Sequence, residues 1–524
     1  MTAQLDRLIQ ALSRPDLYPH HPQSIHVIQT HSSVIFLAGD LVYKVKKPID
    51  LGFLDFTTLE KRKYYCAQEV RLNSRFSEGV YLGVVSIHQG PQGINLNGEG
   101  EEIDVAVLMK RLPEERMLLT MLRNDQVTLE IVDLVADRVA YLHSHAPTGP
   151  EISRFGAPGV IRYNAEENFE QTRPYIGRTI DQQTYEELVA LTMEFLESQR
   201  SLFGHRVREG FIRDCHGDLH LEHVVILNGI ILYDCIEFND RFRYGDTAAD
   251  LAFLLMDLDF RGFPAFADRM ARRYHDSSGD PHVMDLLDYY KSYRAFVRGK
   301  VLSFTLDEPE VSDVEKEAAR AAAHDYFALA LSYLKPAARP NLIITNGLSA
   351  SGKSYLAERL ALMLGLEPIR SDVIRKEIHN VEPTQHRLDK YREGIYTSGA
   401  TERTYEALLE TARRQLIRGQ SVILDAAFGS RRYREQAGEL ANQVKAGFRI
   451  VECSAPDSVL RDRLLQRMES TDDPSDARLE ILEHQKSDFE PIDDSERAYC
   501  RTWDSTTDLY DFLKRFVREL ITSP

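Results

Sequence analysis

The stretch GLSASGKS, residues 347–354, constrains the fold more than any other, because it has the spacing G-x-x-x-x-G-K-[ST]. The apolar run LIIT precedes it and the amphipathic run SYLAERLALML follows it. A strand, a glycine-rich turn and a helix in this order direct backbone N–H groups and a helix N-terminus at a phosphate group. The pattern predicts an α/β domain with a mainly parallel sheet and a nucleotide site. Its expected ligands are Gly347, Ser351, Gly352, Lys353 and Ser354, of which Ser354 also binds magnesium.

Two further stretches of this half point to phosphoryl transfer. EPIRSDVIRKEI places Asp372 at the end of a second strand, where a carboxylate could orient or deprotonate an acceptor hydroxyl. The basic pair Arg375 and Lys376 could hold an anionic substrate. The alternative is that Ser371 or Asp372 caps a helix, and both roles can coexist. SVILDAAF ends in Asp425, which we expect to face the magnesium ion.

A run of arginines follows these strands. VLRDRLLQRMESTDDPSDARLEILEHQKSDFEP carries Arg461, Arg463 and Arg467 on one predicted helix, followed by a polar stretch. Such a segment suits a lid whose arginine, Arg463 in our prediction, closes over the transferring phosphate. A solvated helix face is the alternative for each arginine.

The first half of the chain contains a second, unrelated arrangement for nucleoside triphosphates. In CHGDLHLEHVVILNGIILYDCIEFND, we expect Asp218 to accept or orient an acceptor hydroxyl and Asp234 to hold the metal ion. Upstream, LVYKVKKP gives Lys44 and CAQEVRLN gives Glu69, candidates for an ion pair that positions the α- and β-phosphates. VLMKRLP, residues 107–113, stands where a hinge would meet adenine. The order of these elements favours a kinase-like fold.

Chain length sets the domain plan, because 524 residues are too many for one ordinary core. The proline-rich stretch LKPAARPN follows a long helical pattern and places a boundary near residue 337. We predict a first domain over 1–337, with an N-lobe of alternating strands and one helix up to about residue 110. A mostly helical C-lobe completes it, and a second domain spans 338–524.

Charge, cysteines and hydropathy argue against several classes of protein. The net charge of −17 disfavours a general nucleic-acid binder. The five cysteines have no CxxC spacing, which fits a reducing compartment and no zinc site. No stretch reaches the roughly 18 apolar residues of a membrane span, and the first residues lack the pattern of a signal peptide. We therefore expect a cytoplasmic protein without a membrane partner.

These motifs carry two resemblances. On HGDLHLEH, LYDCIEFND and GDTAADLAFLLMDL, residues 20–335 resemble the aminoglycoside-phosphotransferase-like family, which implies a bilobal α+β protein-kinase-like domain. Residues 338–524 resemble small P-loop kinases of the polynucleotide-kinase, zeta-toxin and gluconate-kinase group. The whole chain is similar to predicted bifunctional proteins that join two such domains. The resemblance implies ATP and Mg²⁺ as cofactors and leaves the acceptor open.

The sequence departs from the family pattern at His223. In this superfamily, H-x-D-x-x-x-x-N ends in an asparagine whose side-chain oxygen binds magnesium. We expect His223 to stand in the metal shell, where it offers nitrogen, whereas magnesium prefers oxygen. Three outcomes are open: one metal held by Asp234, a preference for Mn²⁺, or nucleotide binding without turnover. Glu222 and Glu237 are nearby carboxylates that could compensate, and the rest of the motif is intact, which favours activity.

The sequence thus predicts an ATP-dependent phosphotransferase with two nucleotide sites and a small-molecule hydroxyl as phosphate acceptor. One alternative is that the kinase-like domain senses a ligand and regulates the P-loop domain. Another is a kinase that acts on nucleic-acid ends, which the acidic charge disfavours. Neither the acceptors nor the oligomeric state can be predicted.

Overall fold

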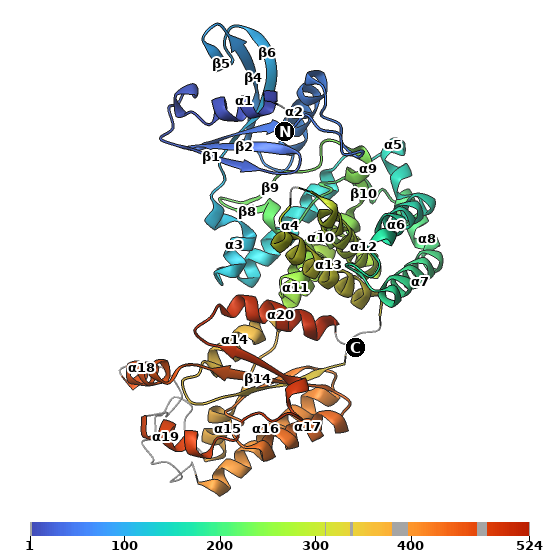
Figure 1. Ribbon diagram of the computed structural model, residues 1–524. Coiled ribbons are helices and arrows are strands. Elements are labelled where there is room, and N and C mark those ends of the chain that lie inside the picture. The colour runs from blue at the N-terminus through green and yellow to red at the C-terminus, as the bar shows by residue number, and fades with distance from the viewer. Residues whose placement is uncertain (1–2, 310, 336–338, 380–396, 469–478, 523–524) are drawn as a thin grey trace. The chain divides into compact units, whose positions relative to one another are not determined.

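The computed structural model describes residues 3–309, 311–335, 339–379, 397–468 and 479–522 (Figure 1). The chain forms two compact units. The first comprises Met1–Asp257 and Ala267–Leu334, and the second comprises Leu258–Phe266 and Lys335–Pro524. The boundary that the sequence predicts near residue 337 falls outside the described residues and stays a prediction. None of the described helices is long and apolar enough to cross a membrane.

The first unit begins with a six-stranded antiparallel sheet in the order β1-β2-β3-β6-β4-β5. Its strands are β1 (Ile25–Gln29), β2 (Ser33–Ala38), β3 (Leu41–Lys46), β4 (Tyr81–Gly90), β5 (Gly93–Leu96) and β6 (Glu101–Lys110). The helices that pack with this sheet are α1 (Ala3–Leu12) and α2 (Leu59–Asn73). β-Branched and aromatic residues fill strands such as SVIFLA and LVYKVK, in keeping with their preference for pleated surfaces.

The alternation of side chains along β3 decides which residues face α2. Val45 packs with side chains of α1 in the core on one face of the sheet. Val42 packs with Cys66 of α2 in the core on the other face. Because successive side chains of a strand point to opposite faces, Lys44 and Lys46 lie on the same face as Val42. Both lysines are thereby directed toward α2.

The rest of this unit is mostly helical, as the sequence predicts. Its helices are α3 (Leu118–Arg123), α4 (Leu129–His145), α5 (Pro150–Ser153), α6 (Pro158–Thr172), α7 (Gln182–Ser198), α8 (Arg200–Arg208), α9 (Asp240–Arg243), α12 (Val283–Phe304) and α13 (Asp313–Leu334), together with most of α10 (Thr247–Phe260) and α11 (Pro264–Ser278). Two short antiparallel strand pairs lie among them: β7 (Ile212–Asp214) with β10 (Tyr244–Asp246), and β8 (Val224–Ile226) with β9 (Ile230–Leu232). The loop between β7 and β8 carries the H-x-D motif.

A buried ion triad joins α8, β10 and the loop between α11 and α12. The Arg206 guanidinium donates to both carboxylate oxygens of Asp246 at 2.6 and 2.7 Å, and to both of Asp280 at 2.8 Å. All three side chains are at most 2% exposed. Removing one carboxylate would leave part of the guanidinium charge buried without its partner, which is costlier than the loss of the pair as a whole.

We predict that Asp280→Ala lowers the free energy of unfolding by about 3–5 kcal/mol, the usual effect of breaking a buried ion pair from one side. The matched control is Glu166→Ala, which removes an exposed ion pair with Arg162 and should cost about 0.5 kcal/mol or less. Urea unfolding followed by far-UV circular dichroism measures both. Equal losses in the two variants would contradict a bracing role for the triad.

The second unit contains a five-stranded sheet in the order β12-β13-β11-β14-β15, and every strand pair is parallel. The strands are β11 (Asn341–Asn346), β12 (Ile369–Arg370), β13 (Val422–Asp425), β14 (Gly447–Ser454) and β15 (Cys500–Asp504). The helices are α14 (Lys353–Leu364), α15 (Ser371–Ile378), α16 (Ser398–Ile417), α17 (Arg431–Gln443), α18 (Asp457–Met468), α19 (Leu479–Asp488) and α20 (Leu509–Thr522). Helices α14 and α20 lie on one side of the sheet, and α16 and α17 lie on the other (Figure 1).

Parallel strands bring their carboxyl ends to one edge of the sheet, where such folds bind ligands. The glycine-rich loop follows β11, Arg370 ends β12 and Asp425 ends β13. The predicted fold class is therefore confirmed: a bilobal kinase-like α+β unit is followed by an α/β unit with a parallel sheet.

Candidate functional site

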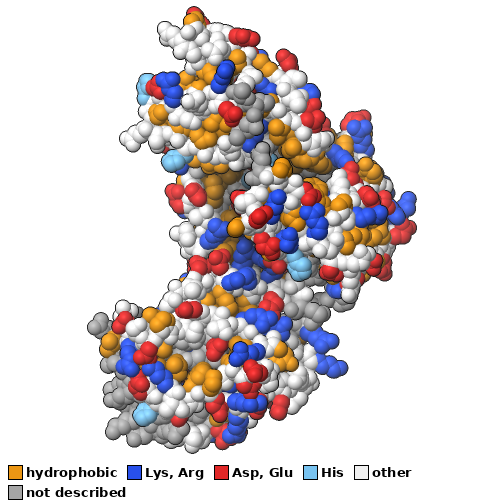
Figure 2. All heavy atoms as spheres, viewed as in Figure 1, with side chains coloured by type: hydrophobic (Ala, Val, Ile, Leu, Met, Phe, Trp, Pro, Cys, Tyr) orange, Lys and Arg blue, Asp and Glu red, His pale blue; other side chains and the backbone are white. Residues whose placement is uncertain are grey.

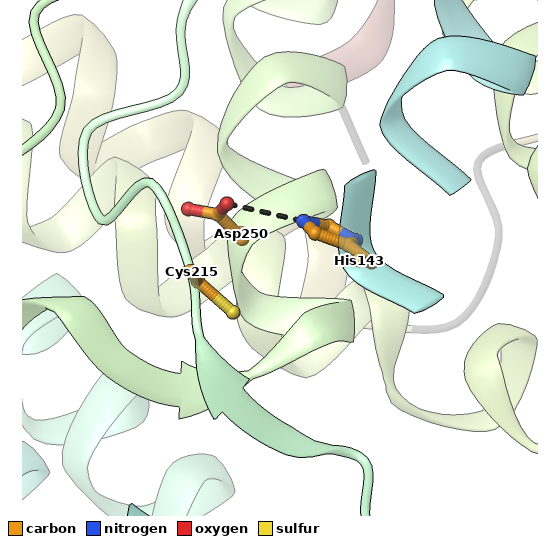
Figure 3. Close-up of side chains that lie close together, drawn as sticks. All are labelled: His143, Cys215 and Asp250. Atoms are coloured by element: carbon orange, nitrogen blue, oxygen red, sulfur yellow. Dashed lines mark hydrogen bonds and ion pairs between the residues drawn. The ribbon is translucent and has the colours of Figure 1, made fainter. Parts of the chain in front are cut away.

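The H-x-D loop of the first unit is held by the buried carboxylate of Asp250. The backbone N–H groups of His216 and Gly217 donate to Asp250 of α10 at 3.0 and 2.8 Å. His143 of α4 lies 3.1 Å from the same carboxylate through Nε2, and its Nδ1 is 2.8 Å from the Tyr274 hydroxyl (Figure 3). Burial opposes ionisation of Asp250, but the hydrogen bond with His143 lowers its pKa to about 2 overall. The loop is therefore hydrogen-bonded to an ionised carboxylate.

Cys215 lies beside this pair in Figure 3, and the three side chains together have the composition of a metal site. The Cys215 thiol instead donates to the Gly245 carbonyl at 3.5 Å. Burial raises the pKa of this thiol, which disfavours the thiolate that a metal needs. Both ring nitrogens of His143 already have partners. We interpret the group as a brace for the loop.

Asp218 projects from this loop next to two histidines. Its carboxylate lies 3.6 Å from His220 Nε2 and 3.8 Å from His223 Nδ1. Burial opposes ionisation of Asp218, but the interaction with His220 lowers its pKa overall, well below the usual range. Asp218 is thus an ionised, partly exposed carboxylate, as a group that orients an acceptor hydroxyl needs to be.

Lys44, Glu69 and Asp234 meet across the two lobes of the first unit. Lys44 Nζ lies 2.9 Å from Glu69 Oε1 and 2.6 Å from Asp234 Oδ1. Burial opposes the ionisation of Glu69, but Lys44 and Lys46 lower its pKa overall. The structure brings together the residues that the sequence assigns to phosphate and metal binding, and their roles remain predictions.

The sequence did not predict that Lys46 and Glu237 take part in the ion network around Glu69. Lys46 Nζ donates to Glu69 Oε2 at 2.6 Å and also to Glu237 Oε1. Lys46 is buried, and although burial lowers its pKa, Glu237 and Glu69 raise it overall. The signal was present in LVYKVK, because lysines two residues apart on a strand share a face. Glu237 serves this lysine rather than compensating at the metal position.

His223 lies in a short 3₁₀ turn, Leu221–His223, directly before β8. Its Nδ1 is 2.8 Å from the Asp218 carbonyl oxygen, and its Nε2 is 3.8 Å from Asp234 Oδ2. Burial, reinforced by His220, lowers the pKa of His223, so the ring is neutral near pH 7. Asp234 has a backbone φ of +61°, a left-handed conformation that a residue other than glycine rarely adopts.

The glycine-rich loop of the second unit lines a cavity of about 830 Å³. A side chain at Gly347 would place Cβ 2.4 Å from the Cys453 carbonyl oxygen, at a φ of +143°. Lys353 Nζ donates to the Leu348 carbonyl at 2.7 Å within the loop. The Ser351 hydroxyl is buried without a hydrogen-bond partner among the described residues. A backbone cradle with an orphaned hydroxyl fits a phosphate group.

Most of the predicted residues of this half line that cavity, but Ser351 and Arg463 are not among its lining residues. It is lined by Gly347, Gly352, Lys353, Ser354, Asp372 and Asp425, among others. Burial raises the pKa of Asp425, while the Ser354 hydroxyl acts in the opposite direction. A hydroxyl beside a carboxylate at the end of a strand is an oxygen ligand set that fits Mg²⁺.

Asp372 faces the same cavity from the first turn of α15. Arg370 occupies the N-cap position of this helix, so the cap interpretation of Ser371 and Asp372 is wrong. Arg375 Nη1 lies 3.3 Å from Asp372 Oδ1 and also lines the cavity. Lys376 is buried instead, so it does not form the expected basic pair with Arg375 at the cavity.

The three arginines of the expected lid differ in their surroundings. Arg463 donates to the Ala350 carbonyl at 3.2 Å and to the Ser505 hydroxyl at 2.7 Å, so it ties α18 to the glycine-rich loop. Arg461 pairs with exposed acidic side chains, as a solvated helix face would. The side chain of Arg467 lies outside the described residues. The role of Arg463 over the phosphate stays a prediction.

The fold and these sites define a protein built from two kinase-like phosphotransferase domains. Residues 72–287 match the Phosphotransferase enzyme family, and residues 342–492 match an AAA domain. Uncharacterized proteins of Mycobacterium tuberculosis and Mycobacterium bovis are each 32% identical to this chain over 460 residues, which is 87% of this chain and 88% of theirs. The chain belongs to one family with these mycobacterial proteins.

Several solved structures that are similar to parts of this chain are described as kinases. A choline/ethanolamine kinase family protein from Mesorhizobium loti is 12% identical to this chain, with a TM-score of 0.37. The matched region covers 63% of this chain and 99% of the chain of that protein. A gluconokinase from Sinorhizobium meliloti is 21% identical, covers 35% of this chain and 93% of its own, and has a TM-score of 0.25.

The two lysines of β3 should differ in what they support. We predict that Lys46→Met lowers the free energy of unfolding by about 3–5 kcal/mol, because it leaves buried carboxylates short of a cation. Lys44→Met should cost less, because the buried Glu69 keeps Lys46 as a partner and the other carboxylate that Lys44 contacts, Asp234, is partly exposed to water. Urea unfolding of both variants measures the difference. Equal losses would contradict the assignment of Lys46 as the structural lysine.

Proposed function

We propose that this protein is an ATP-dependent phosphotransferase with a nucleotide site in each unit, and that it transfers the γ-phosphate to a hydroxyl of a small molecule. One observation carries the proposal. In the second unit, the phosphate-binding loop, the Ser354–Asp425 pair and Asp372 line a single cavity. Phosphoryl transfer needs these three functions, namely phosphate binding, metal binding and acceptor orientation, within reach of one another.

The roles in this cavity follow from the chemistry of each group. Backbone N–H groups after Gly347 and the Lys353 ammonium bind the phosphates of ATP. Ser354 and Asp425 would hold Mg²⁺, which neutralises charge on the phosphates when bound. Asp372 accepts a hydrogen bond from the acceptor hydroxyl and orients it, and Arg375 holds the Asp372 carboxylate in place.

Hydroxyl and aromatic side chains that line the cavity support a small, hydroxylated acceptor. Thr397, Ser398 and Thr401 line the cavity, together with the stacked rings of Tyr405 and Tyr433, whose centroids are 3.9 Å apart. A volume of about 830 Å³ suits a nucleotide with a small second substrate. On the face that Figure 2 shows, acidic and basic side chains are mixed over this unit, which suits a small molecule better than a nucleic acid.

The first unit supports the second nucleotide site of the proposal. Lys44 is held between Glu69 and Asp234, so its ammonium stands at the metal-binding carboxylate. Asp218 is an ionised carboxylate on the neighbouring loop. In a kinase-like site, these groups bind the α- and β-phosphates, hold the metal ion and orient the acceptor.

Lys353→Ala tests the phosphate site of the second unit in the full-length protein. In a Lys44→Ala background, which removes turnover by the first unit, we predict that Lys353→Ala lowers ADP formation by about 10²–10³-fold, because a charge that stabilises the transferring phosphoryl group is lost. Lys44→Ala reports separately on turnover by the first unit, and Lys63→Ala, which changes an exposed lysine, is the matched control. Unchanged ADP formation by Lys353→Ala in the Lys44→Ala background would contradict the proposed site.

Asp372→Asn separates acceptor orientation from nucleotide binding. In the same Lys44→Ala background, we predict a rate about 10²–10⁴-fold lower, with the affinity for ATP nearly unchanged. Glu377→Gln, an exposed change on the same helix, should alter neither quantity. The measurements are ADP formation with a metabolite extract as the source of acceptor, and ATP binding by calorimetry. A variant that loses ATP affinity and rate together would speak against this role for Asp372.

A further inference from the structure

Four side chains of types that bind metal ions lie close together in the first unit. Three are on the segment between β7 and β8, and the fourth, Asp234, follows β9. Asp218, His220 and His223 offer ligand atoms that lie within 4.8 Å of one another. Asp234 faces the same group, with Oδ2 3.8 Å from His223 Nε2. The rings of His220 and His223 have centroids 3.9 Å apart, which limits how far the His223 ring can turn.

The hydrogen bond of His223 fixes which nitrogen can bind a metal ion. Its Nδ1 lies 2.8 Å from the backbone carbonyl oxygen of Asp218. A carbonyl can only accept, so Nδ1 carries the proton and donates it. In a neutral ring the lone pair is then on Nε2, which faces Asp234. Metal-binding histidines are typically held in this way, through a hydrogen bond from the other ring nitrogen.

Asp234 divides its two oxygens between different partners. Oδ1 accepts from Lys44 at 2.6 Å, which leaves Oδ2 toward His223. Two ligand bonds of about 2.1 Å span up to about 4.2 Å, so one ion can contact both Nε2 and Oδ2 across 3.8 Å. The left-handed backbone of Asp234 is a strained conformation of the kind that accumulates at functional sites.

A mixed nitrogen and oxygen ligand pair does not match the preference of magnesium. Mg²⁺ binds almost entirely to oxygen, whereas first-row transition ions accept imidazole nitrogen readily. We propose that the first unit binds a divalent transition ion, with Mn²⁺ as the test case, between His223 Nε2 and Asp234 Oδ2 in preference to Mg²⁺. This metal site does not require that either unit transfers phosphate, so it can be tested independently of the proposed function.

The test uses full-length, untagged protein and Mn²⁺ alone, without nucleotide. Electron spin echo envelope modulation detects ¹⁴N bound directly to Mn²⁺, and no nitrogen side chain stands in the ligand set proposed for the second unit. The parent protein should show ¹⁴N modulation. His223→Asn should lose it while retaining bound Mn²⁺, and His26→Asn, which changes an exposed histidine of β1, should keep it.

Competition between the two ions gives an independent readout. We expect Mg²⁺ to displace Mn²⁺ from His223→Asn at a concentration about 10-fold lower than from the parent, since loss even of an outer-shell partner changes metal affinity that much. Asp234→Asn, which retains the histidine, should weaken Mn²⁺ binding and tests the same pair if His223→Asn does not fold. Absence of ¹⁴N modulation in the parent, or its persistence in His223→Asn, would overturn the proposal.

Discussion

The buried carboxylate of Glu69 is the interaction on which the candidate site of the first unit depends. It is fully buried and receives two lysines from one face of β3. Lys46 holds it from the interior and Lys44 from the side that faces Asp234. A carboxylate buried so deeply stays ionised only with such partners. The ion network therefore fixes the position of the lysine that the proposed nucleotide site requires.

A buried carboxylate also fixes the H-x-D loop of the first unit. Asp250 accepts two backbone N–H groups of the H-x-D loop and is itself held by His143. The position of Asp218 is thus set by a side chain far along the chain. In the second unit, the backbone positions the candidate site. The parallel strands end at one edge of the sheet, so the glycine-rich loop, Arg370 and Asp425 lie there.

Much of this could be predicted from the sequence, because the motifs combine fixed spacing with local structure. The G-x-x-x-x-G-K-[ST] run between an apolar strand and an amphipathic helix indicated the α/β unit, and the order of Lys44, Glu69, Asp218 and Asp234 indicated the kinase-like unit. What escaped prediction are pairings between distant segments. Neither the Lys46–Glu237 pair nor the Asp250 brace follows from spacing, since the loop and helix that supply them meet only in the fold. The cap interpretation at Ser371 failed because the helix begins one residue earlier than its polar residues suggest.

Transfer of labelled phosphate from ATP to a small molecule is the most direct test of whether this protein is a phosphotransferase. Full-length protein is incubated with γ-labelled ATP and a metabolite extract, and labelled products are separated and identified by mass spectrometry. We expect a small molecule to gain a phosphate ester while ADP forms in equal amount. ADP accompanied only by inorganic phosphate, or no consumption of ATP with any extract fraction, would contradict the proposed function.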